Sequence, residues 1–436
     1  MIRGWKKRHV FAALGIAMVG FAALMVGLVI WSESRVQARL NALRAAGEPT
    51  SVDELEQLAS VPEGQTDLTQ AWLAAIAPFD SKILPIPQDM NIDSGTPPPG
   101  EDWPQLAKAE ELLTANAAKL EALHLAAEQS GGVYYPGLRQ FMDIQQRLGH
   151  WNQARHAARW LQLEARVRAH RGDPSGAIDS VEAMLAAAES MDREPLIAGF
   201  LVRVAILGMT MEELQTLLES GTLPAENLRE FQQELRKVDL QGGLTLATQG
   251  ERVAGLHWYE HPPTGGGAIG RFAWQVQNGS LSDYLDGMTP IVDATELDWP
   301  EGLTKLETLA AAAANQTNIA LWLQPISAVQ SMTQAAAIIT AKVRAADAAI
   351  AVVLYYQKHG QLPERLDELV PEFLPEVPAD PFHDAPLNYR VENGEVVIYS
   401  VGLDRVDDGG RDVSTDDASR SGDFGFRLPL PDGSAE

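Results

Sequence analysis

Two histidines four positions apart come closest in this sequence to a spacing that could bind a metal. His257 and His261 lie in the segment His-Trp-Tyr-Glu-His. This spacing places two imidazoles on one face of a helix, as a zinc pair requires. However, Glu260 is not at the glutamate position of H-E-x-x-H, Pro262 and Pro263 follow immediately, and no third ligand is evident. A metal-dependent hydrolase outside the cytoplasm therefore stays a second alternative, and packing of a polar, aromatic turn is the preferred interpretation.

A glycine motif follows these histidines. Gly265, Gly267 and Gly270 satisfy G-x-G-x-x-G, but a dinucleotide site requires a hydrophobic strand before the motif. The residues before it are Glu-His-Pro-Pro-Thr, and the sequence also contains neither G-K-[ST] nor G-x-S-x-G. We therefore predict no catalytic residues and no organic cofactor, and we interpret the chain as a non-enzyme.

The third candidate is an acidic segment near the C-terminus. Residues 404–423 contain seven aspartates and three arginines. Calcium takes about six to eight oxygen ligands from carboxylates and carbonyls, and glycines permit the tight turns of such a loop. A solvated acidic loop, partly neutralised by its arginines, is the alternative.

The residues around this segment form a recognisable pattern. It comprises Tyr355, Tyr356 and Gly360, then Leu362-Pro363, Leu369-Val370-Pro371, Pro378-Ala-Asp-Pro-Phe382, Pro386-Leu-Asn-Tyr389, Tyr399-Ser-Val-Gly-Leu-Asp404 and Asp408-Gly-Gly410. In order and spacing, residues 335–417 resemble the globular head of the major pseudopilin of type II secretion systems.

The resemblance implies a calcium site in the acidic loop. The matching positions give a carbonyl ligand at Val401 and carboxylate ligands at Asp404 and Asp412, and we add Asp416 from the same loop. Four residues separate Asp404 from Gly409, one more than in the family pattern.

Pseudopilins begin with a leader, a processing glycine and F-T-L-x-E, which this chain does not show. We therefore expect a reused module on another protein. An accessory component of a type II-like secretion or pilus machine is the first alternative.

The N-terminus predicts how the chain is held at a membrane. Residues 10–31 form an uncharged, apolar run, long enough for a helix that crosses a bilayer. Four basic residues precede this run, so the positive-inside rule places residues 1–9 in the cytoplasm. A cleaved signal peptide is the competing interpretation, but its apolar core is usually shorter. We predict a single-pass protein of the cell (inner) membrane with a periplasmic or extracytoplasmic body.

The rest of the chain predicts a mainly α fold in two parts. Residues 32–330 show helical periodicity with long loops, and Arg171-Gly-Asp-Pro174 matches a tight turn between two helices. This unit weakly resembles a tetratricopeptide-type hairpin, so we expect an irregular helical array. The aromatic, proline-rich stretch from Leu256 to about Pro300 is interpreted as a long loop with short helices.

Residues 331–430 are predicted to form the small α+β pseudopilin-like domain. Its elements are a long helix over 331–358 and two strands over 387–391 and 396–400, joined by a hairpin that contains Asn393-Gly394. The strands should form a short antiparallel sheet.

The composition of the chain limits the classes of function that it could have. The 436 residues carry a formal charge of −25, which disfavours binding to nucleic acid. The absence of cysteine excludes disulfides and thiol chemistry. We therefore predict a membrane-anchored, extracytoplasmic scaffold or protein-interaction protein with a partner of unknown identity.

Overall fold

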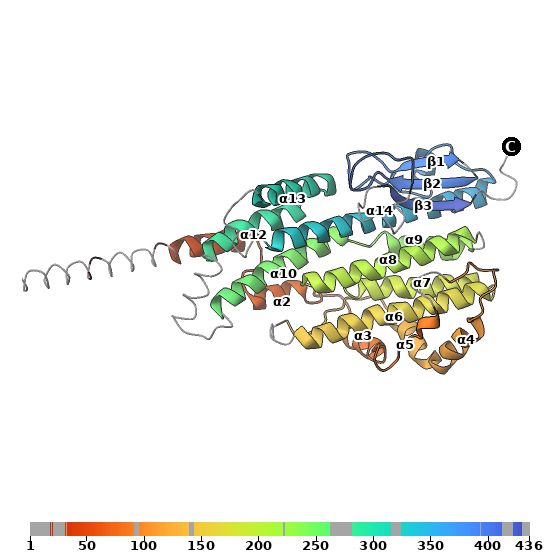
Figure 1. The fold of residues 1–436 in the computed structure, drawn as a ribbon, viewed down its shortest axis with the longest axis horizontal. Coiled ribbons are helices and arrows are strands. Elements are labelled where there is room, and N and C mark those ends of the chain that lie inside the picture. Colours follow the sequence, from red (N-terminus) through yellow and green to blue (C-terminus); the bar gives the residue numbers. More distant parts are fainter. Residues whose placement is uncertain are drawn as a thin grey trace, which may run out of the picture.

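A computed structural model describes most of the chain. The described residues are 33–90, 96–138, 144–220, 223–261, 281–314, 324–392, 394–411 and 422–429, together with Met18, Gly20 and Trp31. They form a mainly α-helical structure with one three-stranded antiparallel sheet, which confirms the predicted fold class at that level. The longest helices run along the long axis of the molecule, and the sheet lies against α14 (Figure 1).

The helices are α2 (Val52–Ala59), α3 (Thr69–Ile76), α4 (Leu106–Ala115), α5 (Ala117–Ala127), α6 (Ile144–His170), α7 (Pro174–Glu189), α8 (Ile197–Glu219), α9 (Ala225–Leu235), α10 (Leu240–Glu260), α12 (Leu281–Thr295), α13 (Trp299–Ala314) and α14 (Gln324–His359). Two short 3-10 helices are η1 (Gln88–Met90) and η3 (Leu366–Leu369). The strands are β1 (Asn388–Glu392), β2 (Glu395–Ser400) and β3 (Phe424–Pro429).

The predicted transmembrane helix at residues 10–31 lies outside the described residues, except for Met18, Gly20 and Trp31. Within the described ranges, no helix combines the length and the apolar character that a bilayer crossing requires. The membrane anchor thus stays a prediction from the sequence.

A helix over residues 33–45 is the first long element that the structure describes. Its apolar face, Val36, Leu40 and Leu43, packs against Leu256 of α10 and Leu285 of α12. These side chains recur at helical spacing, and the contact attaches the segment that follows the predicted anchor to the body.

The predicted tight turn between α6 and α7 is confirmed. Gly172 adopts a φ of 72°, in the left-handed region that ends many helices. The Asp173 carboxylate then accepts a hydrogen bond from the Gly176 N–H at 2.9 Å, and Pro174 is the first residue of α7. These local signals force the two helices into an antiparallel hairpin.

Buried polar contacts also connect α5, α6 and α7. Glu164 of α6 pairs with His124 of α5 at 2.7 Å and with Arg168 at 2.8 Å. It also accepts a hydrogen bond from the Ser180 hydroxyl of α7 at 3.0 Å. Because an incompletely paired buried carboxylate is costly, this network favours a single arrangement of α5, α6 and α7.

After Leu256 the described residues contain more helix than the predicted long loop with short helices. Helix α10 continues to Glu260, and α12 and α13 occupy most of the remaining stretch, while residues 262–280 lie outside the described ranges. Tyr259 of α10 packs on Tyr284 of α12, with ring centroids 5.5 Å apart. A Cβ at Gly255 would lie 1.9 Å from the Tyr284 hydroxyl, so the glycine permits this close approach. Tertiary packing therefore overrides the weak helical signal.

The two predicted strands and their hairpin are confirmed as β1 and β2, with Tyr389 paired to Ile398. The structure adds β3, which pairs with β2 and was not predicted. Helix α14 is longer than predicted and packs against α8 and α9 as well as the sheet. One helix therefore belongs to both the helical body and the C-terminal module.

Candidate functional site

The predicted calcium ligands are only partly within the described residues. The Val401 N–H donates to the Asp380 carboxylate at 2.9 Å, and the exposed Asp404 accepts a hydrogen bond from the Val406 N–H at 3.1 Å. Asp412 and Asp416 lie outside the described ranges. Among the residues that are described, no group of three or more His, Asp or Glu side chains could hold a metal ion. The calcium site stays a prediction from the resemblance.

Two other aspartates, Asp380 and Asp423, stabilise the C-terminal module through hydrogen bonds. The buried Asp380 accepts hydrogen bonds from Ser400 and from the N–H of Phe382, both at 2.8 Å, in addition to that from Val401. Asp423 is also buried and accepts from the Gly410 N–H at 2.6 Å. Its second carboxylate oxygen has no hydrogen-bond partner among the described residues, and burial raises the pKa of this carboxyl. Asp423 therefore contributes to the module through its hydrogen bond to Gly410.

The histidine pair lies on helix α10 and on the residue after it. The rings of His257 and His261 are stacked, with centroids 4.6 Å apart and planes at 26°. Ring stacking directs the nitrogen lone pairs along two nearly parallel planes, which is unlike two ligands converging on one ion. Burial, followed by the charge of His261, lowers the pKa of His257. This geometry does not favour the hydrolase alternative.

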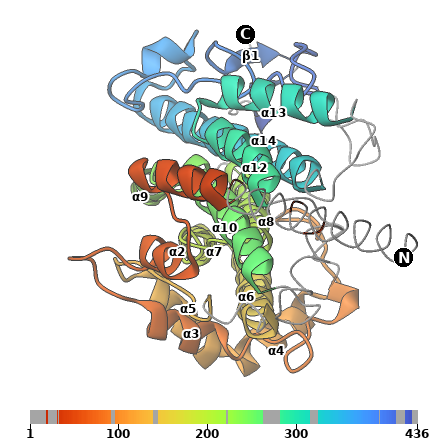
Figure 2. The ribbon, with the colours of Figure 1, turned by 90° about the vertical axis from the view of Figure 1, so that its left-hand side faces the viewer.

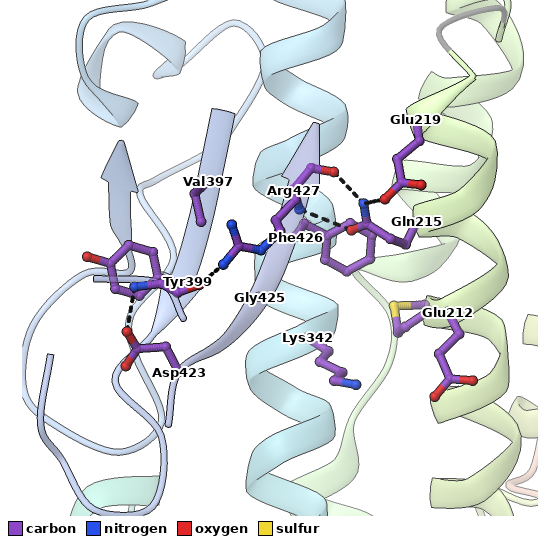
Figure 3. A pocket seen from close by; sticks show the side chains of 12 residues that line it. Glu212, Gln215, Glu219, Lys342, Val397, Tyr399, Asp423, Gly425, Phe426 and Arg427 are labelled. Carbon is purple, nitrogen blue, oxygen red and sulfur yellow. Dashed lines mark hydrogen bonds between the residues drawn. The ribbon is translucent and has the colours of Figure 1, made fainter. Parts of the chain in front are cut away.

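A small pocket lies where the C-terminal module meets the helical body. Its volume is about 200 Å³, and it is lined by residues of α8, α14, β2 and β3 (Figure 3). Gln215 of α8 accepts a hydrogen bond from the Arg427 N–H at 3.1 Å and donates one to the Arg427 carbonyl. Lys342, Glu212 and Asp423 give the pocket mixed charges. The Gln215 contact makes this pocket part of the junction between module and body.

Two adjoining cavities form a groove, which we name the acidic groove. The larger cavity, about 680 Å³, lies among α3, α5, α7, α9 and the segments that follow them. The smaller, about 520 Å³, lies among α2, α8 and the beginning of α10. Both are lined by Glu189, Asp192 and Lys237, so they adjoin there. Helix α7 lies between α5 and α9 (Figure 2).

The acidic groove combines apolar and acidic side chains. Leu68, Trp72, Val133 and Leu185 border the larger cavity but are only 2–6% exposed. The apolar surface that is open to a ligand comes from the partly exposed Ala127 and Ala186 there, and from Leu58 and Leu246 at the smaller cavity. One lysine, Lys237, and six carboxylates also line this cavity: Glu128, Glu182, Glu189, Asp192, Glu230 and Glu234.

The basic residues of the groove are already engaged. Arg203 pairs with Glu189 at 2.9 Å, and Lys237 pairs with Glu234 at 2.6 Å. Arg193 donates three hydrogen bonds of 2.8–3.0 Å to the carbonyls of residues 58–60, at the C-terminal end of α2. The carboxylates of Glu128, Glu182 and Glu230 are thus without an ion-pair partner among the described residues, whereas the charges of Arg203 and Arg193 partly offset that of Asp192.

Two of these carboxylates have raised pKa values. Burial, followed by the charges of Asp179, Glu230 and Glu234, raises the pKa of Glu182 to about 7. Burial also raises the pKa of Asp192 to about 6, and one Asp192 carboxylate oxygen is buried without a hydrogen-bond partner among the described residues. Both groups would be stabilised in their charged form by a cation in the groove.

Comparisons with protein families, with curated proteins and with solved structures found no match to this chain. The function is therefore inferred from the residues themselves. Sequence reasoning had not identified the acidic groove, because its walls come from segments between Leu58 and Glu296 that only the fold brings together. The many carboxylates of the chain gave no way to select these few.

Proposed function

We propose that this chain is a membrane-anchored, extracytoplasmic protein-interaction protein that binds a protein partner in the acidic groove. In this proposal, residues 10–31 hold the chain in the inner membrane, with residues 1–9 in the cytoplasm. The helical body supplies the binding surface, and the C-terminal module is a docking unit fixed on that body. The observation that carries the proposal is the acidic groove.

The shape and lining of the acidic groove suit a polypeptide. Two adjoining cavities form an elongated site, whereas small-molecule sites are usually a single enclosed and mostly apolar pocket. Leu58, which is 42% exposed, and the partly exposed Leu246 and Ala186 offer apolar contact, and polar side chains surround them. An apolar centre within a polar rim is the usual anatomy of a protein-binding surface.

The way in which the C-terminal module packs on the helical body supports a role as a scaffold. Helix α14 packs on α8, α9, β2 and β3, so the module shares its longest element with the body. Gln215 and the ion pair between Arg236, the residue after α9, and Asp347 of α14, at 2.9 Å, add polar contacts at this junction. A partner bound in the groove and one bound to the module would then be held at a fixed separation.

Filling the acidic groove tests this proposal. Ala186 lines the larger cavity and is partly exposed, so Ala186→Trp should block the site while leaving the helix intact. Partners that co-purify with the full-length protein from native membranes should be lost with Ala186→Trp. They should be retained with Leu125→Trp, an exposed position of α5 that does not line the groove. Equal recovery with both variants would contradict the proposal, and recovery of a secretion platform would favour the secretion-machine alternative.

A further inference from the structure

Resting on the proposed function, we propose that the occupant of the acidic groove is a cationic polypeptide segment rich in lysine or arginine. Charge complementarity, the apolar lining and the length of the groove each restrict what can bind there.

The charge of the groove is uncompensated by the chain itself. The side-chain carboxylates of Glu128, Glu182 and Glu230 have no hydrogen-bond or ion-pair partner among the described residues. They lie on three different segments: the C-terminal end of α5, the middle of α7 and the middle of α9. A cationic chain that follows the groove would meet carboxylates on both walls, which gives favourable pairing and excludes acidic segments.

The partly buried positions strengthen this inference. Glu182 is shielded by α9 and the chain around it, and one oxygen of Asp192 is almost inaccessible and unpaired. Water screens such groups less than it screens exposed carboxylates, so a cation beside them gains more. Asp192 also lines both cavities, so its charge, which Arg203 and Arg193 partly offset, lies at the middle of the groove.

Other cationic occupants fit less well. A bare metal ion requires several ligands around one point, and the described residues form no such group. A small polyamine would leave the exposed surface of Leu58 uncovered. The alkyl stems of lysine and arginine can cover apolar surface while their charged ends reach carboxylates. A polypeptide is therefore the occupant that uses both features of the groove.

The test uses the full-length protein in nonionic detergent and a fluorescein-labelled deca-lysine peptide, followed by fluorescence anisotropy. Because the whole chain is acidic, weak binding to other surfaces must be separated from binding in the groove. The groove variant is Glu182→Gln/Glu230→Gln. The matched control, Glu121→Gln/Glu226→Gln, removes the same charge from exposed positions of the same α5–α9 region that do not line the groove. Unlabelled spermine, at the same charge concentration as the peptide, serves as a competitor.

We expect the groove variant to weaken deca-lysine binding about tenfold and the control about twofold or less. Spermine should compete far less well than unlabelled deca-lysine. Equal weakening in both variants, absence of binding, or equal competition by spermine would each overturn the inference. If Ala186→Trp still abolishes partner recovery in that case, the groove binds a partner of another chemistry, and the proposed function stands without this inference.

Discussion

Gln215 of α8 hydrogen-bonds both backbone groups of Arg427 in β3, with its side-chain oxygen 3.1 Å from the Arg427 nitrogen. The amide side chain thereby pairs with the outer edge of β3 as a neighbouring strand would. A free strand edge invites pairing with other chains, so this contact both closes the edge and attaches the module to the body.

Replacing Gln215 by leucine should loosen this junction. The variant leaves the backbone N–H and carbonyl of Arg427 without their protein partner, which should lower the free energy of unfolding by about 1 kcal/mol. Hydrogen exchange should show faster exchange of the Arg427 amide, while amides of β2 remain protected. Gln233→Leu, at an exposed position of α9, should change neither quantity. An unchanged Arg427 amide would show that Gln215 does not hold the strand.

The raised pKa of Glu182 predicts that ionisation of this group lowers the stability of the folded state as the pH rises. Its folded-state pKa is about 7 and its ordinary value is 4.5, so the folded state binds the proton more tightly than the unfolded state. The contribution of this group to stability is therefore most favourable below pH 4.5 and is lost as the pH rises to about 7. Glu182→Gln should match the wild type near pH 5 and exceed it at pH 8 by about 1–2 kcal/mol, after allowance for solvent screening of a partly exposed group.

Denaturant unfolding at both pH values measures this difference. Glu121→Gln, an exposed substitution on α5, provides the control and should show no pH-dependent gain. An identical gain for both variants, or none for Glu182→Gln, would show that Glu182 ionises normally.

The pseudopilin resemblance predicts that calcium stabilises the C-terminal module. Calcium should raise the melting temperature of the full-length protein, and Asp404→Ala/Asp412→Ala should abolish the rise. Magnesium should not replace calcium, because it prefers a smaller octahedral site and retains its waters. A rise that survives the double substitution would place calcium elsewhere, and no rise would remove the predicted cofactor.

The predicted anchor can be tested by placing charge in its centre. Each arginine at the middle of a spanning helix opposes insertion by about 3 kcal/mol. Gly20→Arg/Leu24→Arg should therefore release the protein from membranes washed with carbonate, whereas wild type and Leu125→Arg should remain. Retention of the doubly charged variant in the membrane would contradict an anchor at residues 10–31.

Local signals predicted much of the fold. Gly172, Asp173 and Pro174 specify the turn between α6 and α7 through backbone conformation and capping, and these effects need no distant residue. The β1–β2 hairpin was predicted for the same reason. Strand β3 was missed because Gly425 and Pro429 lower its strand propensity, and its stability comes from pairing with β2 and from Gln215.

The candidate site could not be predicted from the sequence. Glu182 resembles any exposed glutamate of a helix until the fold places α9 beside α7 and buries part of its side chain. Trp72 belongs to a helix far away in the chain, and only the tertiary structure brings it to the same cavity. Burial and proximity distinguish a few of the many carboxylates, and both properties depend on residues that are distant in the sequence.

Site-specific photo-crosslinking in intact cells tests most directly whether the acidic groove binds a protein partner. A photoreactive amino acid at Gln233, which lines the larger cavity, should give a discrete adduct with another polypeptide. The same amino acid at Glu301, an exposed position of α13 away from the groove, should give none, and Ala186→Trp should abolish the Gln233 adduct. Failure to form an adduct at Gln233, or an equal adduct at Glu301, would contradict a partner-binding groove.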